Sequence, residues 1–311
     1  MVQILKALAD ETRLRLMALL ARGDFNVNEL VEVLQTGQSR VSHHLKILAD
    51  SGLVRNRREG NWIYYSLANS NGGDRGLVEA FNLGLKAAAS LSTHEADLRK
   101  LESVVQRRRS LSTKYFDRIG SSWERLQQEV LDSTYYRQQV LSYLPGNGTV
   151  AADLGTGSGY LLPMLLSKFD SVLAIDASQT MLKVAADCVA AEIPDRAASC
   201  EFRLGELEHL PIPDNHVDAA VACMVLHHIS NPAEALQEAS RIMKPGGMLV
   251  IADLLQHNVT EMREKYADLW MGFDPKQLRK WLRGAGLKVV RHEVLKKSEV
   301  MKILMFQSLK P

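Results

Sequence analysis

The sequence predicts two domains, an α+β domain followed by a larger α/β domain with a largely parallel sheet. Its 311 residues are about twice the ~150 typical of one domain. Near the N-terminus, short amphipathic segments precede two adjoining strand-like runs. From about residue 115 onward, apolar strand-like runs alternate with helical ones, which is typical of a parallel sheet covered by helices. We expect domains at 1–75 and 115–311, with a helical segment at 76–114 between them.

Composition excludes several classes of protein. The chain is 46% hydrophobic and 24% charged, which is ordinary for a globular protein. Its three cysteines, Cys188, Cys200 and Cys223, form neither a CxxC pair nor a disulfide framework. No apolar run reaches the ~18 residues that a membrane span needs. We therefore expect a cytoplasmic protein without a membrane partner.

The first 50 residues read as three helices. Residues 5–23, "LKALADETRLRLMALLARG", have leucines at helical spacing, and Gly23 predicts the end of a single helix there. Asn26 and Glu29 have capping-box spacing and begin a second, short helix. A third helix follows in "SRVSHHLKILADSGLV", where a buried stripe is expected of Val41, Leu45 and Leu48.

The opposite face of this third helix is polar and partly basic. Such a face of hydrogen-bond donors is expected of a helix in the major groove of DNA. His44 lies nearer the buried stripe, so it either packs inside the domain or makes a backbone-side contact. The predicted DNA-contacting residues of the helix are Ser39, Arg40, Ser42, His43 and Lys46.

A β-hairpin is predicted after the third helix. The run "LVRNRREGNWIYYSL" contains two strand-like segments joined at Glu59-Gly60-Asn61, where Gly and Asn suit a turn with positive φ. Although the net charge is only +2, residues 38–65 hold five basic side chains against two acidic ones. The hairpin thus forms a basic wing, with further DNA contacts expected from Arg55, Arg57 and Arg58.

Helices, helix-turn-helix and wing occur here in the order of a known family. Through "LKALADETRLRLMALL" and "QSRVSHHLKILADSGLV" with its hairpin, residues 1–68 resemble the ArsR-type winged-helix repressors. The resemblance implies a double-stranded DNA operator as partner. Metal-sensing members carry a cysteine pair where this chain has "NELVEVL", and a later helix offers only His94 with Glu95 and Asp97. We therefore expect no bound metal.

The segment between the two domains carries an apolar stripe. From Gly76 to about Arg109 the pattern is helical, and a stripe outside both cores needs a partner. In winged-helix repressors the corresponding helix makes the dimer, so a homodimer and a palindromic operator are expected. The run 107–109 is all arginine, either contacting phosphates or forming a solvated helix end. The stripe consists of Leu77, Phe81, Leu85 and Ala88, continued by Leu98, Leu101 and Val105.

Residues 149–165, "TVAADLGTGSGYLLPML", predict a strand, a glycine-rich turn and a helix. A dinucleotide-binding turn of the type GxGxxG would need glycine at position 160, which is Tyr160. NAD and FAD are therefore disfavoured. The glycines allow a cofactor to approach the backbone closely, and Asp153 at the strand end can meet an ammonium group. The turn glycines are Gly155, Gly157 and Gly159.

Two more acidic residues follow strands in this second part. Asp176 ends the strand "SVLAIDAS", where a carboxylate can accept both hydroxyls of a ribose, and Glu206 follows the strand "FRLG". With the glycine turn, these motifs resemble the class I S-adenosylmethionine-dependent methyltransferases over residues 115–311, which have a Rossmann-like sheet. The resemblance implies S-adenosylmethionine or S-adenosylhomocysteine as the ligand.

By this resemblance, further residues receive roles. Asp176 and Ala177 would lie at the ribose, and Glu206 with the Leu207 backbone at the adenine. Tyr115, Phe116 and Trp123 would close over the cofactor, unless they simply pack in the core.

Methyl transfer itself is less clearly marked. His227 and His228 follow the fourth strand, where they could act as a base or shape the pocket wall. An Asn/Asp-Pro-Pro-aromatic motif for nucleic-acid amines is replaced by "CMVLHH", and Cys223 lacks the preceding proline of a cytosine C5 enzyme. Arsenite methylation would need cysteines upstream of the cofactor turn, and the first one is Cys188.

Two functions follow from these expectations. In the first, the protein is a transcriptional repressor whose C-terminal domain senses S-adenosylmethionine or S-adenosylhomocysteine, similar to the S-adenosylhomocysteine-responsive regulators of the methionine cycle. In the second, it is an active methyltransferase for a small acceptor, with the winged helix as its regulatory DNA-binding domain. The absence of an acceptor signature favours the first, and the complete set of cofactor motifs favours the second.

Overall fold

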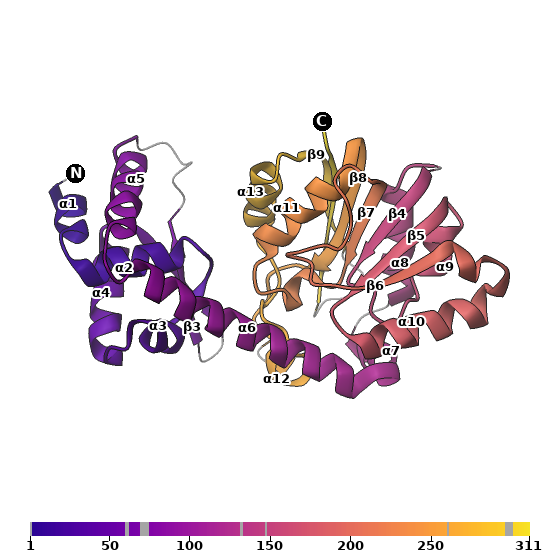
Figure 1. Ribbon diagram of the computed structural model, residues 1–311, viewed down its shortest axis with the longest axis horizontal. Coiled ribbons are helices and arrows are strands. Elements are labelled where there is room, and N and C mark those ends of the chain that lie inside the picture. The colour runs from indigo at the N-terminus through magenta and orange to yellow at the C-terminus, as the bar shows by residue number, and fades with distance from the viewer. Residues whose placement is uncertain are drawn as a thin grey trace. The chain divides into compact units, whose positions relative to one another are not determined.

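The computed structural model describes residues 2–59, 62–68, 75–130, 133–146, 148–259, 261–295 and 301–311. The chain divides into two compact units, residues 1–108 and 109–311, here called the N-terminal unit and the C-terminal unit (Figure 1). The helical segment expected at 76–114 is thus divided between the two units. Its first helix belongs wholly to the N-terminal unit, and the boundary between the units falls within its second helix. None of the described helices combines the length and apolar character that crossing a bilayer requires.

The N-terminal unit is a helical domain with a small antiparallel sheet. Its strands lie in the order β1-β3-β2, and the wing strands pair from Val54 with Leu67 to Glu59 with Trp62. Of the predicted wing turn, Gly60 and Asn61 lie outside the described residues. The elements are α1 (Val2–Leu8), α2 (Glu11–Leu20), β1 (Phe25–Asn26), α3 (Val27–Leu34), α4 (Gln38–Asp50), β2 (Val54–Glu59), β3 (Trp62–Leu67), α5 (Arg75–Ala89) and the start of α6 (His94–Ile119).

Helix capping explains where the first helices begin. The prediction of a single N-terminal helix is wrong, because Asp10 interrupts it as the N-cap of α2, its carboxylate accepting from the Arg13 N–H at 3.1 Å. The capping box of α3 is confirmed. The Asn26 side chain accepts from the Glu29 N–H at 3.1 Å, and the Glu29 carboxylate accepts from the Asn26 N–H at 2.9 Å.

The apolar stripe of α5 has a different role from the predicted one. Phe81 is buried in the core of the N-terminal unit, and Leu77 and Leu85 pack against the same core. Leu101 and Val105 of α6 also belong to it. The stripe therefore does not lie outside the cores, and its periodicity is no evidence for a dimer.

The C-terminal unit is built on a seven-stranded sheet in the order β6-β5-β4-β7-β8-β10-β9. The pairs from β6 to β8 are parallel, whereas β10 runs antiparallel to both of its neighbours. This confirms the predicted α/β fold with a largely parallel sheet. The strands are β4 (Gly148–Leu154), β5 (Phe169–Asp176), β6 (Cys200–Leu204), β7 (Val217–Cys223), β8 (Met243–Leu254), β9 (Lys288–Leu295) and β10 (Ile303–Leu309).

Helices cover both faces of this sheet (Figure 1). Alternate residues of one strand face opposite sides, so Ala151 packs with α8, α9 and α10, whereas Ala152 packs with α11 and α13. The helices are α7 (Trp123–Val130), α8 (Ser133–Tyr143), α9 (Leu162–Leu166), α10 (Gln179–Glu192), α11 (Pro232–Ile242), α12 (Glu261–Tyr266) and α13 (Pro275–Gly284), with short 3-10 turns η1 (Gly120–Ser122), η2 (Pro194–Ser199) and η3 (Leu226–His228).

The strand order reverses at β4. The chain passes from β4 to β5 and β6 on one side, then crosses to β7 and β8 on the other. In open α/β sheets, ligands bind beyond the carboxyl ends of the strands at such a switch point. The ends of β4 and β7 are therefore the place to look for a site.

Candidate cofactor site and DNA-contacting face

A pocket opens beyond the carboxyl ends of β4, β5 and β7, and we call it the strand-end pocket. Its lining includes two acidic residues at the carboxyl ends of β4 and β5, the penultimate Asp153 and the last residue Asp176, together with Gly155 and Gly157 of the glycine turn. The sequence pattern predicts that these four residues belong to one site, and the fold places them around one pocket. Other lining residues include Ser112, Thr113, Phe116, Trp123, Arg137, Ala177, Met181, Leu207, Val225 and His228.

The glycine turn is held between the first two strands. The N–H groups of Gly155 and Thr156 donate to the carbonyl of Ile175 at 2.8 and 2.9 Å. Gly157 has φ +53°, and a Cβ added to it would meet no atom nearer than Met181 Cε at 3.8 Å. Gly159 has φ +81°, and its Cβ would lie 2.7 Å from the Cα of Ala185 on α10. Gly157 therefore leaves space in the pocket, whereas Gly159 allows close packing of the turn against a helix.

The two strand-end carboxylates differ in their environment. Asp153 is 2% exposed and accepts from the Thr156 hydroxyl at 2.7 Å, and burial raises its pKa to about 6. Asp176 accepts from the N–H groups of Gly157 and Ser178, both at 2.9 Å. Burial raises the pKa of Asp176 as well, although these backbone donors oppose the shift. The bond from Gly157 ties the glycine turn to the carboxylate that ends β5.

Three aromatic side chains lie beside the pocket in different ways. Phe116 of α6 and Trp123 of α7 line it, with ring centroids 5.1 Å apart in an edge-to-face contact. Tyr115 is buried against Trp123 and Met181, and its hydroxyl donates to the Lys265 carbonyl. Burial raises the pKa of Tyr115 to about 12. Tyr115 thus takes the core-packing role, while the other two remain available to a ligand.

Of the two residues expected at the adenine, Glu206 and Leu207, only Leu207 lines the pocket. Glu206 forms an ion pair with Arg109 at 3.0 Å, and its side chain is 41% exposed. The same guanidinium pairs with the buried Glu208 at 3.1 Å. Glu206 is thus held by the α6 side of the unit.

Arg137 is a lining residue that sequence reasoning missed. It lies on α8, and its guanidinium donates to the two carboxylate oxygens of Glu124 at 2.9 and 2.7 Å. In the sequence it is one charge within a mixed polar helix, so no motif distinguishes it. Only the packing of α8 against the sheet brings this cation to the pocket.

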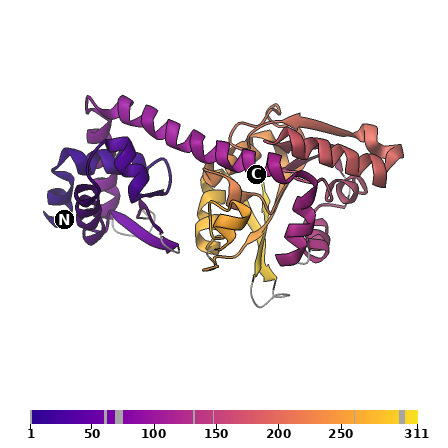
Figure 2. The same cartoon turned by 90° about the horizontal axis from the view of Figure 1, so that it is seen from below.

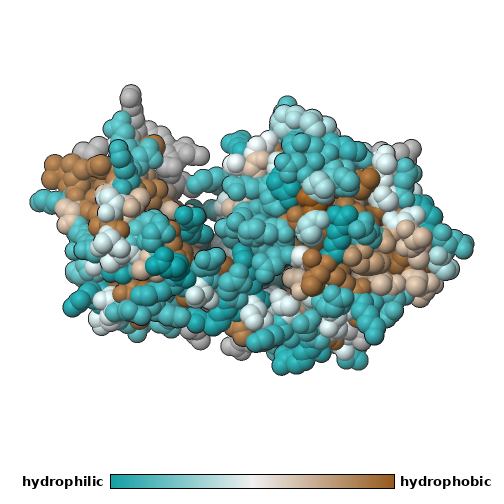
Figure 3. All heavy atoms as spheres, viewed as in Figure 1, coloured by the Kyte–Doolittle hydropathy of each residue, from teal (hydrophilic) through white to brown (hydrophobic). Residues whose placement is uncertain are grey.

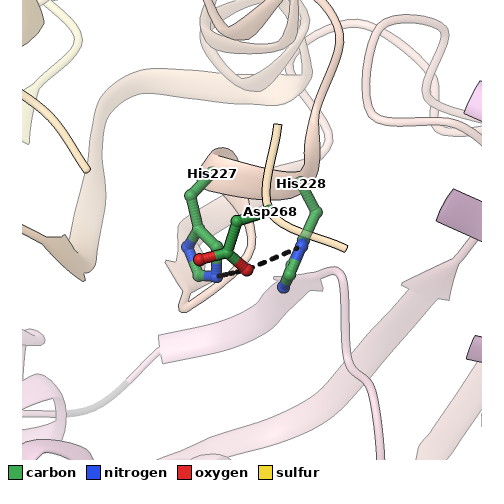
Figure 4. A group of neighbouring side chains, drawn as sticks. All are labelled: His227, His228 and Asp268. Carbon is green, nitrogen blue, oxygen red and sulfur yellow. Dashed lines mark ion pairs between the residues drawn. The ribbon is translucent and has the colours of Figure 1, made fainter. Parts of the chain in front are cut away.

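The two histidines after β7 both lie beside Asp268 (Figure 4), but they have different surroundings. His228 lines the pocket, edge-on to Phe116 with centroids 4.9 Å apart. His227 points to Asp253, with Nδ1 2.6 Å from a carboxylate oxygen. Desolvation lowers the pKa of His227, but the carboxylates of Asp253 and Asp268 outweigh it and raise the pKa to about 9. Burial and the neighbouring His227 hold the pKa of His228 well below its usual value, so its imidazole is neutral at pH 7.

The predicted DNA-contacting residues occupy one helix and the wing. On α4, four of the five are exposed and Ser42 is half-buried, while Val41, Leu45 and Leu48 form the expected buried stripe. His44 packs inside the unit, with Nδ1 3.6 Å from Asp10 and 3.4 Å from Arg13.

On the wing, Arg55 and Arg58 are exposed. Arg57 is partly buried and forms an ion pair with Asp24 at 3.6 Å.

The arginine run 107–109 is not a helix end, because α6 continues to Ile119, and its contact with phosphates stays a prediction. Arg107 pairs with Glu32 at 2.7 Å, and the Nε of Arg108 donates to Glu29 at 2.6 Å. Arg109 holds Glu206 and Glu208 in the C-terminal unit. All three guanidinium groups are thus engaged by carboxylates.

Comparison with known proteins identifies both units. The family described as "Bacterial regulatory protein, arsR family" matches residues 10–56, and the family "Methyltransferase domain" matches residues 152–251. The chain therefore joins an ArsR-type winged-helix DNA-binding domain to a methyltransferase domain of the class I fold.

Individual relatives agree with this division. A transcriptional repressor SmtB homolog of Synechocystis sp. (strain ATCC 27184 / PCC 6803 / Kazusa) is 45% identical over 71 residues, which are 23% of this chain and 54% of that protein. A malonyl-acyl-carrier-protein O-methyltransferase of Marinomonas sp. (strain MWYL1) is 28% identical over 181 residues, 56% of this chain and 61% of that one. Three of the most similar curated relatives are covered over 34% to 61% of their own length.

Among solved structures, the N-methyltransferase NodS from Bradyrhizobium japonicum WM9, in complex with S-adenosyl-l-homocysteine, has a TM-score of 0.53 at 14% identity. The similarity covers 64% of this chain and 98% of that chain. At this identity the likeness shows the fold alone.

Proposed function

We propose that the protein is a cytoplasmic transcriptional regulator that binds operator DNA and senses S-adenosylmethionine or S-adenosylhomocysteine in the strand-end pocket. Asp153 would meet the ammonium group of the ligand, and Asp176, with Ala177, its ribose hydroxyls. Arg137 is a cation on the same pocket wall, and the carboxylate of the amino-acid moiety would compete with Glu124 for its guanidinium. Leu207 would lie at the adenine.

One observation carries the sensing proposal. Helix α6 is a single helix of 26 residues (Figure 2). Leu101 and Val104 of this helix are buried in the core of the N-terminal unit, whereas Ser112, Thr113 and Phe116 line the strand-end pocket. A ligand that shifts Phe116 therefore acts on a helix whose other half belongs to the DNA-binding domain. A coupling of ~1–3 kcal/mol would change DNA affinity about 5- to 150-fold.

The helix also supplies Arg109, which pairs with Glu206 and Glu208 next to the pocket residue Leu207. A ligand at the adenine end of the pocket would therefore change the surroundings of this ion pair. Substitution of Arg109 by Gln is expected to weaken the effect of ligand on DNA affinity while ligand binding persists. Equal coupling in this variant would remove the ion pair from the proposal.

For DNA binding, the proposal relies on the exposed polar face of α4 and on the wing. The donors Ser39, Arg40 and Lys46 suit base edges and phosphates in a major groove. Arg55 and Arg58 suit the phosphates beside it.

We also propose a homodimer, and thus a palindromic operator, but on different residues from the sequence-based ones. Val2 and Leu5 of α1 are 68% and 47% exposed, and Leu83 of α5 is 54% exposed. Helices α1 and α5 pack together, so these side chains can form one apolar surface, visible at the upper left of Figure 3. Leu83→Glu is expected to give a monomer in sedimentation velocity, whereas Leu111→Glu, an exposed leucine outside this surface, should not change the mass. An unchanged mass for Leu83→Glu would exclude this dimer.

The sensing experiment uses the full-length protein. Operators are first selected from random-sequence duplex DNA, and their binding is measured by fluorescence anisotropy with each ligand added separately. The proposal predicts a change of at least about fivefold in DNA affinity. Equal affinity with and without either ligand would contradict it.

A second function, methyl transfer to a small acceptor, is supported by His228. It is a neutral imidazole on the pocket wall, as a general base must be, although its lowered pKa makes it a weaker base than an ordinary histidine. In this case S-adenosylmethionine would be consumed when an acceptor is supplied, and His228→Gln would slow that turnover. Turnover of the wild-type protein across a panel of thiol, amine and hydroxyl acceptors tests this alternative.

A further inference from the structure

A cluster of four buried side chains lies behind the pocket wall, apart from the residues assigned to the cofactor. His227 and His228 come from η3, and Asp268 comes from the segment after α12 (Figure 4). Asp253 comes from β8. Their side chains are between 0% and 5% exposed. Buried ionisable groups are normally paired with opposite charges or coordinate a metal. The distances within the cluster show how the four groups are arranged.

One contact is a direct hydrogen bond, and two are too long to be one. His227 Nδ1 lies 2.6 Å from Asp253 Oδ1, but His227 Nε2 lies 3.8 Å and His228 Nδ1 lies 3.6 Å from Asp268 Oδ1. Hydrogen bonds between such groups are about 2.7–3.2 Å long. The two imidazoles thus face one oxygen at a distance that suits an ion between them, and His228 Nδ1 also lies 3.4 Å from the carbonyl oxygen of Ala267, which an ion would displace as its partner.

These separations fit a metal centre. One ligand atom from each of His227, His228 and Asp268 lies within 4.8 Å of the others. Around a tetrahedral ion with metal–ligand bonds of ~2.1 Å, ligand atoms are about 3.4 Å apart. The separations of 3.6 and 3.8 Å are close to this value.

The surroundings of His227 provide independent support. Asp253 accepts from His227 Nδ1, and its other oxygen accepts from the Leu226 N–H at 2.8 Å. This arrangement fixes the ring with Nε2 toward Asp268. Metal-bound histidines commonly donate their second nitrogen to a buried carboxylate, which fixes the tautomer and the ring orientation.

From this geometry we propose that His227, His228 and Asp268 bind one divalent transition-metal ion, with Asp253 as the carboxylate that orients His227. Two imidazoles and one carboxylate suit Zn²⁺ or Fe²⁺, whereas Mg²⁺ and Ca²⁺ prefer oxygen ligands. This departs from the sequence-based expectation of no metal, since the ligands come from segments 40 residues apart. Three protein ligands leave a coordination position for water or for a donor atom of a small molecule.

The site touches the strand-end pocket, because His228 belongs to both. A small molecule in the pocket that carries a thiol, hydroxyl or carboxylate could therefore reach the open coordination position. The inference does not depend on the sensing role, because it rests on the four side chains alone.

The test uses the full-length protein, stripped with a chelator and titrated with Zn²⁺ against a chromophoric competitor. We expect one Zn²⁺ per chain, with affinity lowered at least about 100-fold by Asp268→Asn or His228→Gln. Asp253→Asn should lower it about 10- to 100-fold. His209→Gln, an exposed histidine elsewhere in the unit, is the control and should bind Zn²⁺ as the wild type does. Unchanged affinity in Asp268→Asn, or no stoichiometric binding by the wild type, would overturn the proposal.

A second measurement needs no variant. X-ray absorption of the Zn²⁺-loaded wild type should show nitrogen and oxygen neighbours at ~2.0–2.2 Å with the scattering pattern of imidazole. A sulfur shell at ~2.3 Å would place the ion on cysteine instead and would overturn the assignment.

Discussion

Two glycines of the same turn are expected to respond differently to alanine. For Gly157→Ala, the left-handed backbone costs about 1–2 kcal/mol of folding stability, and the added Cβ meets no protein atom nearer than 3.8 Å. That methyl instead occupies ligand space, where overpacking costs about 1–3 kcal/mol, a roughly 5- to 150-fold loss of ligand affinity. For Gly159→Ala, the Cβ lies 2.7 Å from backbone on α10, so stability should fall by about 2–5 kcal/mol.

Calorimetric titration with S-adenosylhomocysteine and guanidinium unfolding followed by circular dichroism separate the two effects. Gly157→Ala should lose mainly affinity, and Gly159→Ala mainly stability. If Gly157→Ala bound the ligand within about twofold of the wild type, the glycine turn would not be part of the cofactor site. If Gly159→Ala were as stable as the wild type, the close packing of the turn against α10 would be contradicted.

Three further predictions concern charged residues. Asp176→Ala should weaken S-adenosylhomocysteine binding by about 3 kcal/mol, since hydrogen bonds to a charged acceptor contribute about 1.5–3 kcal/mol each. Asp170→Ala is the control, because Asp170 is exposed at the start of β5, and it should not weaken binding. Equal titration curves for Asp176→Ala and the wild type would refute the ribose assignment. The pKa of Asp153 is raised to about 6, and a bound ammonium favours its carboxylate, so ligand affinity should be full from about pH 7 upward, about half at pH 6, and lower by up to about tenfold per unit below that. A flat affinity profile from pH 5 to 8 would exclude that contact. Arg40→Ala should reduce the slope of log DNA affinity against log salt by about one. Arg57→Ala should reduce this slope by less, because Asp24 competes with phosphate for the Arg57 guanidinium. An unaltered slope for Arg40→Ala would show that α4 does not contact DNA phosphates.

The sequence was sufficient where a local pattern determines the geometry. Asp153 and Asp176 lie at the carboxyl ends of neighbouring parallel strands, so their position at one edge of the sheet follows from the fold class alone. The capping box at Asn26 is likewise a matter of spacing. The pattern also identified the buried stripe of α4, because helical periodicity reports which face is apolar.

Periodicity does not report what an apolar face packs against. The α5 stripe was therefore read as a dimer surface, although Phe81 packs in the core of its own unit. The same limit applies to Arg137 and to the pairing of Asp268 with the histidines after β7. These contacts join segments that are distant in sequence. Neither Arg137 nor Asp268 belongs to a sequence motif that would predict its contacts.

The most direct test of the account is operator binding by the full-length protein, titrated with S-adenosylmethionine or S-adenosylhomocysteine while turnover of the methyl donor is followed in the same mixture. We predict a change in DNA affinity of at least about fivefold without consumption of S-adenosylmethionine, and loss of this response in Asp176→Ala. Consumption of S-adenosylmethionine with an added acceptor, at constant DNA affinity, would contradict sensing and identify an enzyme that carries a DNA-binding domain.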